Sequence, residues 1–170
     1  GVKKAPAFEP DDLDTWPYPA ADLQYGLGYV PLLTATGCPY DCAYCAAGLL
    51  QPERRLRSPK SVAEEIHYWH TRYGVCNFAF YDDALLVNPR AHAVPMFEAI
   101  MDLGLDLAFH TPNALHARHI TPEIARLMRA AGMKTVRLGV ETTDFEKRRM
   151  DRKISAEEFV QAAASLKAAG

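Results

Sequence analysis

Short β-rich runs alternate with longer segments of helical periodicity along most of this chain. The runs lie at about 29–36, 77–81, 106–110 and 134–140, and a helical pattern follows each of them. Strands that alternate with helices in this way are joined by right-handed βαβ crossovers, which place the strands parallel. The pattern therefore predicts an α/β fold with about four βα units in one parallel sheet.

The helical segments carry recognisable start and stop signals. Their starts are marked by Ser58-Pro59, Asn88-Pro89, Thr121-Pro122 and the capping box Ser155-Ala-Glu-Glu158. Their ends are expected at Gly74, Gly104, Gly132 and Gly170. Apolar residues fall on one face of the first helix (Val62, Ile66, Trp69, Tyr73) and of the second (Val94, Phe97, Met101). Pro95 is awkward inside the second pattern and can delay the true start of that helix.

The composition is that of one ordinary globular domain, with 49% hydrophobic and 24% charged residues. No apolar run is long enough to span a bilayer, and we expect a cytoplasmic protein whose thiols stay reduced. Lys and Arg total 19 against 21 Asp and Glu, so no excess of positive charge indicates nucleic-acid binding. Four cysteines without a signal peptide are too few for a secreted disulfide scaffold.

Residues 1–28 show no sustained period, and we expect an extended lead-in that packs along the domain formed by residues 29–170. This segment is rich in proline, at Pro6, Pro10, Pro17 and Pro19.

The strongest chemical signal is the loop Cys38-Pro-Tyr-Asp-Cys42-Ala-Tyr-Cys45, directly after the first predicted strand. Three thiolates in one short loop can hold three corners of a 4Fe–4S cluster, which leaves one iron without a protein ligand. A structural zinc site is the alternative. Zinc prefers paired CxxC or CxxH half-sites, and no second pair is present, although His110 or His116 could supply a fourth ligand.

Cys76 is the remaining cysteine, and a fourth thiolate near the loop would favour an electron-transfer cluster instead. It stands at the start of the second predicted strand, whereas the loop follows the end of the first. In a parallel sheet these positions are about one strand length apart, ~15–20 Å. We therefore expect Cys76 to be a small buried residue away from the cluster.

The cysteine loop, with Tyr44 just before Cys45, resembles the cluster motif of the radical S-adenosylmethionine (SAM) enzymes. The resemblance implies that the free iron chelates the amino and carboxylate groups of SAM. One electron, from a donor of the flavodoxin or ferredoxin type, then cleaves the sulfonium, and the 5′-deoxyadenosyl radical abstracts hydrogen from a substrate. The core of this family is a partial (β/α) barrel of about six βα units. We therefore expect this chain to hold its first part, with further domains or a partner chain completing the barrel.

A second resemblance concerns the segment Asp12-Leu-Asp-Thr-Trp-Pro17-Tyr-Pro19. It is similar to the connector that joins a cobalamin-binding domain to the catalytic domain in one branch of the family. The resemblance leaves open a cobalamin-dependent methyltransferase, with cobalamin held by a domain outside this chain.

The other candidate ligands follow the predicted strands, where active sites of parallel α/β barrels lie. Asp82 or Asp83 would suit the ammonium of SAM, and the sequence leaves open which one faces inward. Gly139-Val-Glu141 resembles the family's Gly-x-Glu signature, whose glutamate contacts SAM, and Tyr44 would lie against the adenine. Asn113 follows the third strand as a further candidate.

Each of these residues also has a purely structural interpretation. The aspartates can solvate a loop, Glu141 can bond a loop amide, and Asn113 can cap a turn. His110 is either a substrate-side acid or a satisfied barrel histidine. For His116 and His119, loop solvation is the simplest expectation.

Overall fold

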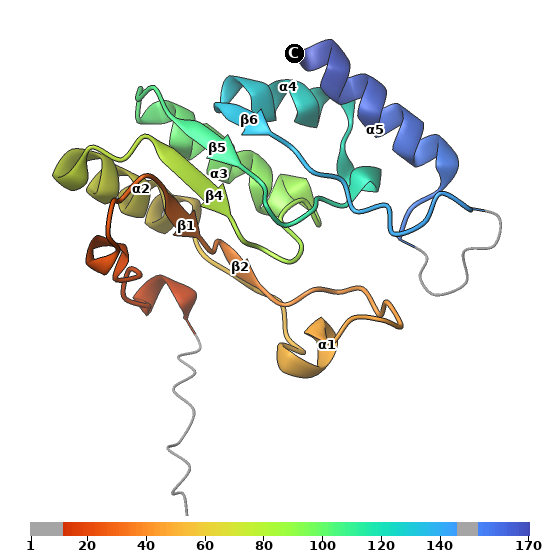
Figure 1. The fold of residues 1–170 in the computed structure, drawn as a ribbon, viewed down its shortest axis with the longest axis horizontal. Helices are drawn as coiled ribbons and strands as arrows, with labels where there is room; N and C mark the ends of the chain where they lie inside the picture. The colour runs from red at the N-terminus through yellow and green to blue at the C-terminus, as the bar shows by residue number, and fades with distance from the viewer. Residues whose placement is uncertain (1–11, 146–152) are drawn as a thin grey trace, which may run out of the picture.

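A computed structural model describes residues 12–145 and 153–170, so Pro6 and Pro10 of the lead-in lie outside the described residues. Four strands form a parallel sheet in the order β1-β4-β5-β6 (Figure 1). Their bounds are β1 Val30–Leu32, β4 Asn77–Phe80, β5 Ala108–His110 and β6 Met133–Thr135. The predicted α/β class and parallel sheet are confirmed.

One long helix follows each of these strands. The helices are α2 Pro59–Tyr73, α3 Ala93–Asp102, α4 Pro122–Ala130 and α5 Ala156–Ala169. The predicted caps form at three of them, because Ser58, Thr121 and Ser155 each accept a hydrogen bond from the backbone N–H of the third helical residue. The chain thus builds four successive βα units.

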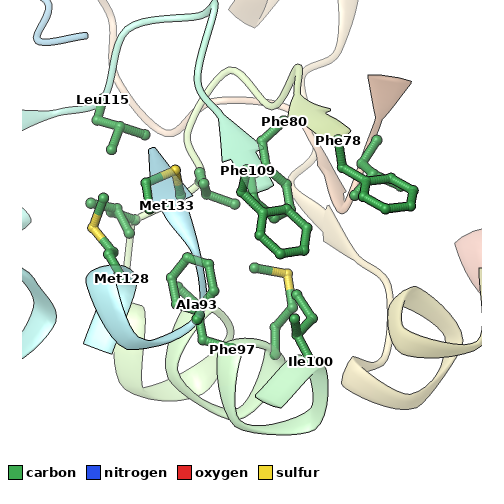
Figure 2. Packing of buried hydrophobic residues seen from close by; sticks show 14 of the residues in the cluster. Phe78, Phe80, Ala93, Phe97, Ile100, Phe109, Leu115, Met128 and Met133 are labelled. Atoms are coloured by element: carbon green, nitrogen blue, oxygen red, sulfur yellow. The ribbon is translucent and has the colours of Figure 1, made fainter. Parts of the chain in front are cut away.

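The core lies between the sheet and its helices. Phe78 and Phe80 of β4 and Phe109 of β5 are fully buried and face Phe97 and Ile100 of α3 (Figure 2). The rings of Phe80 and Phe109 are stacked with centroids 5.3 Å apart, and Phe80 meets Phe97 edge-on at 6.1 Å. Since side chains alternate along a strand, the residue between Phe78 and Phe80 of β4 faces the other side of the sheet.

The second helix differs from the prediction in its start and its buried face. A 3-10 turn, Pro89–Ala91, precedes it, and α3 itself begins at Ala93. Pro95 then falls in the first turn, where its missing N–H breaks no helical hydrogen bond. Met101 is 37% exposed, whereas Met96 is buried, so the predicted apolar face was wrong at that end.

The first predicted strand divides into two. After β1, the chain leaves the main sheet and β2 (Ala35–Thr36) pairs antiparallel with β3 (Arg55–Leu56). The short helix α1 (Ala47–Leu50) lies in the loop between them. The last strand also stops earlier than predicted, at Thr135, and an isolated parallel bridge joins Leu115 to Leu138 beyond it.

The described part of the lead-in contains two 3-10 turns, Leu13–Thr15 and Ala21–Leu23, and packs beside α2. Asp14 accepts a hydrogen bond from the backbone N–H of Ser58, and the rings of Tyr18 and Tyr68 are 5.3 Å apart. Within the described residues, every helix is too short or too polar to cross a lipid bilayer.

Candidate cofactor site

The cysteines lie on a long excursion between β2 and β3, residues 37–54, which we call the cluster loop. Its two ends are held together by the β2–β3 pair and by the backbone at Gly37. Gly37 has φ +75°, and a Cβ there would lie 2.5 Å from the carbonyl oxygen of Glu53. The N–H of Gly37 also donates to Oε1 of Gln51 at 2.9 Å. Glycine is thus required where the loop closes, one residue before Cys38.

The three thiols of the loop are free, with Cys38 and Cys42 half-buried and Cys45 exposed. Burial raises the pKa of Cys38, and the nearby negative charges of Asp83, Cys42 and Cys45 act in the same direction. Among the described residues, no group of three His, Cys, Asp or Glu side chains is already arranged to hold a metal ion. Metal sites often assemble only as the metal binds, and three free thiols on one loop can hold three corners of a 4Fe–4S cluster.

Cys76 is separated from these thiols as expected, since it immediately precedes β4 at the opposite end of the sheet. The expectation that it is buried was wrong. Its thiol is exposed and lies 3.8 Å from Nδ1 of His70.

The first part of the cluster loop contacts the segment that follows β5. Tyr40 stacks on His116, with ring centroids 4.6 Å apart, and its hydroxyl lies 2.7 Å from Nε2 of His119. His116 is only 4% exposed, so loop solvation was the wrong expectation for it. Burial lowers the pKa of His116 to about 4 and also lowers the pKa of His119.

The two aspartates after β4 have opposite surroundings. Asp82 is 4% exposed, and its Oδ1 accepts hydrogen bonds from the N–H and hydroxyl of Thr34 and from the N–H of Ala35. Burial raises the pKa of Asp82 to about 6, and its Oδ2 is buried without a hydrogen-bond partner in the described part of the chain. Asp83 is exposed and close enough to Cys38 to influence its titration. Of the pair, Asp83 is thus the exposed residue, and its charge reaches Cys38.

Two further residues join the buried polar cluster around Asp82. Nε2 of His92 lies 2.9 Å from the hydroxyl of Thr34, and Arg54 donates to the carbonyl of Ala84 at 3.1 Å. Burial, with the charge of Arg54 as a smaller cause, lowers the pKa of His92 to about 4. Sequence reasoning missed these residues, because no periodicity or motif connects the loop end at Arg54 with a histidine before α3.

The remaining candidates stand at the carboxyl ends of β5 and β6. Asn113 donates from Nδ2 to the backbone carbonyl of Tyr81 at 2.8 Å, which ties the β5 and β4 ends together. Glu141 has φ +61°, and its Oε1 accepts from Nζ of Lys153 at 3.0 Å. A Cβ on Gly139 would lie 2.7 Å from the same Nζ, so Gly139 leaves room for that lysine. Tyr44 is 46% exposed on the cluster loop.

The sheet face turned away from the helices bears a shallow cavity of about 380 Å³. Its polar lining comes mainly from Tyr29, Tyr81, His110, Thr135 and Arg137. Nδ1 of His110 lies 2.9 Å from Oγ1 of Thr135, so this histidine already has one partner in the sheet. The cavity runs along this face of the sheet, from Asn77 at the start of β4 to Tyr81 beyond its end.

Comparison with models of known families matches residues 32–170 to the radical SAM superfamily. This chain belongs to that superfamily, whose members are enzymes that use a 4Fe–4S cluster and SAM. It is 29% identical over 139 residues to an uncharacterized methyltransferase of Pyrococcus horikoshii, which covers 77% of this chain and 30% of the relative. It is also 28% identical over 141 residues to the hopanoid C-2 methylase of Rhodopseudomonas palustris. This match covers 78% of the chain and 26% of the methylase.

Solved structures share the fold. The radical SAM methyltransferase TsrM from Kitasatospora setae, with cobalamin and a 4Fe–4S cluster bound, has a TM-score of 0.72 at 19% identity and covers 84% of this chain and 27% of its own. HydG, a maturase of the FeFe hydrogenase, has a TM-score of 0.59. The chain spans less than a third of the length of the Pyrococcus methyltransferase and of the hopanoid C-2 methylase.

Proposed function

We propose that this chain carries the cluster loop and most of the SAM contacts of a radical SAM enzyme, as the first four βα units of a longer catalytic core. When bound, the cluster supplies the electron that cleaves SAM reductively to a 5′-deoxyadenosyl radical. The observation that carries the proposal is the arrangement of three free thiols on one loop beside Asp83 and past the carboxyl end of β1.

Each candidate residue then has a role that its surroundings support. Cys38, Cys42 and Cys45 would hold the cluster, and Tyr44 would lie against the adenine. Asp83 is the better candidate for the SAM ammonium, because the oxygens of Asp82 are buried and Oδ1 already accepts three hydrogen bonds.

The carboxyl ends of β5 and β6 supply the remaining contacts in this proposal. Glu141 would accept a hydrogen bond from SAM. Lys153 would hold its carboxylate in place, since Nζ of Lys153 lies 3.0 Å from Oε1 of Glu141. Asn113 would present its amide oxygen, since its Nδ2 is engaged by the carbonyl of Tyr81.

We further propose that the complete protein is a methyltransferase of the cobalamin-dependent branch. Two relatives are methyltransferases by name, and TsrM binds cobalamin. Cobalamin would be held by a separate domain, outside the four βα units. A reductant of the flavodoxin or ferredoxin type would reach the cluster from the exposed side of Cys45.

Anaerobic reconstitution with iron and sulfide, followed by optical and EPR spectra with and without SAM, tests the proposal. We expect a 4Fe–4S spectrum whose EPR signal changes when SAM is added, and no such spectrum after replacement of the three loop cysteines by Ala. A colourless protein that binds one zinc ion would support the structural alternative. A cluster whose EPR signal ignores SAM would support an electron-transfer module.

A further inference from the structure

The shape of the cysteine segment depends on contacts made far away in the sequence. Residues 37–46, all of them described, form neither helix nor strand. Tyr40 lies midway between Cys38 and Cys42, and its ring and hydroxyl contact His116 and His119. Both histidines are more than 70 residues further along the chain, with a separation of 79 for the second. The position of Tyr40 therefore influences the relative placement of the first two thiols.

The segment that receives Tyr40 is itself firmly attached. A 3-10 turn, Ala117–His119, ends it, and Arg118 in that turn pairs with Glu158 of α5 at 3.4 Å. On its other side, the N–H of Leu115 donates to the carbonyl of Arg137 at 2.8 Å, and the side chain of Leu115 is buried. Tyr40 thus rests on a platform that is fixed both to the sheet end and to α5.

We propose that His116 and His119 are positioning residues for the iron–sulfur cluster, acting through Tyr40 and binding no iron themselves. This inference rests on the proposed function, because it assumes that the loop holds a cluster. A ring stacked on Tyr40 and a partner for its hydroxyl restrict the loop before the cluster forms, which reduces the conformational entropy lost on binding. They also set how far the cluster is exposed to solvent, which is one determinant of its reduction potential.

Positioning and ligation place different demands on the side chain at position 116. A phenylalanine there can keep the aromatic stack on Tyr40 but cannot bind iron. If His116 positions Tyr40, His116→Phe retains the cluster. If His116 is a metal ligand, as the zinc interpretation allows, the same substitution loses the metal.

The test compares Tyr40→Ala, Tyr40→Phe and His116→Phe with Tyr25→Ala, a fully exposed tyrosine outside the cluster loop that serves as the matched control. Three measurements are made: hydrogen exchange of residues 38–46 in the cluster-free chain, the rate at which a chelator removes iron from the reconstituted chain, and the EPR spectrum of the reduced cluster.

For Tyr40→Ala we expect faster exchange in the loop, iron release accelerated about tenfold or more, and an altered EPR signal. Tyr40→Phe, which keeps the stack and loses the hydroxyl, should fall between Tyr40→Ala and the unmodified chain. His116→Phe and Tyr25→Ala should release iron close to the unmodified rate.

Several outcomes would overturn the inference. Unchanged exchange, iron release and EPR in Tyr40→Ala would show that the contact does not position the loop. Complete iron loss in His116→Phe, with Tyr40→Phe unaffected, would instead make the histidine a ligand. If the unmodified chain takes up no iron at all, the proposed function fails together with this inference. If the unmodified chain takes up iron and Tyr40→Ala changes none of the three measurements, only the inference is rejected.

Discussion

Oδ1 of Asp82 accepts hydrogen bonds from both the backbone N–H and the hydroxyl of Thr34, at 3.0 and 2.7 Å. Asp82 follows β4, whereas Thr34 lies between β1 and β2, 48 residues earlier. This buried contact lies where the chain leaves the main sheet, just before β2 and the cluster loop. Asp82 is therefore engaged in holding this segment, whereas its neighbour Asp83 is exposed.

We expect replacement of Asp82 to lower the stability of the chain and replacement of Asp83 to weaken its binding of SAM. Asp82→Ala leaves the N–H groups of Thr34 and Ala35 buried without an acceptor, which should cost about 2–5 kcal/mol of unfolding free energy. Asp83→Asn should change stability by less than about 0.5 kcal/mol but weaken SAM binding by about ten- to hundredfold. Urea unfolding and SAM titration of the reconstituted chain measure both quantities. Loss of SAM affinity in a stably folded Asp82→Asn variant, with Asp83→Asn unaffected, would reverse the assignment.

Gly37→Ala should disrupt the closure of the cluster loop. The new Cβ would meet the Glu53 carbonyl at 2.5 Å, and alanine is strained at φ +75°. We expect a loss of about 1–3 kcal/mol and less iron bound per chain after reconstitution. Gly48→Ala is the control, because nothing lies within 4 Å of a Cβ at that position. Equal iron content in the two variants would show that the closure tolerates a side chain.

The iron content of single cysteine variants tests the ligand set. Replacement of Cys38, Cys42 or Cys45 by Ala should remove most of the iron, because each would leave a second iron without a protein ligand. Cys76→Ala should keep it, since Cys76 lies at the amino end of β4, away from the loop. Iron and sulfide analysis after anaerobic reconstitution decides the matter, and equal loss in all four variants would contradict the assignment.

Glu141→Gln should weaken SAM binding by about ten- to hundredfold, through the loss of one charge-assisted hydrogen bond. Lys153→Gln is the informative companion, because it removes the 3.0 Å partner of Glu141 but leaves the carboxylate. If Lys153 only orients Glu141, its replacement should have the smaller effect. Isothermal titration with SAM provides the comparison, and unchanged affinity in Glu141→Gln would remove this residue from the site.

The buried histidines make the stability of the chain dependent on pH. Burial lowers the pKa values of His92 and His116 to about 4 in the folded chain, whereas both are about 6.5 in the unfolded chain. Below that pH the unfolded state binds more protons, so the free energy of unfolding should fall by about 1.4 kcal/mol per pH unit for each histidine. Asp82 acts in the opposite sense, because its pKa of about 6 makes the folded state take up the extra proton over about pH 4–6.

The net expectation is a loss of stability on acidification from about pH 7 to about pH 5, measured by urea unfolding of the cluster-free chain. His92→Gln should make that loss smaller. His67→Gln, on the exposed side of α2, is the control and should leave the dependence unchanged. An identical pH dependence in His92→Gln would show that His92 takes up its proton at the same pH in the folded and the unfolded chain.

Local sequence signals predicted the helices well because helix ends depend on neighbouring residues. The helix ends at Ser58, Gly74 and the Ser155–Glu158 capping box form hydrogen bonds within one or two turns. Their role can therefore be predicted from the adjacent residues. Periodicity failed where the environment overrode it. Met101 matched the apolar pattern of α3, but the sheet contacts the side of the helix that carries Met96 and Ile100.

The donor groups of the candidate site could be predicted from local motifs: three thiols in CxxxCxxC spacing, an acidic pair after β4 and Gly139-Val-Glu141 after β6. The burial of Asp82, the break of the first strand at Thr34 and the contact of Tyr40 with His116 and His119 become visible only in the folded chain. These contacts join residues 48 to 79 positions apart. No local pattern encodes them, because burial and hydrogen-bond partners at such separations arise only when the βα units pack together.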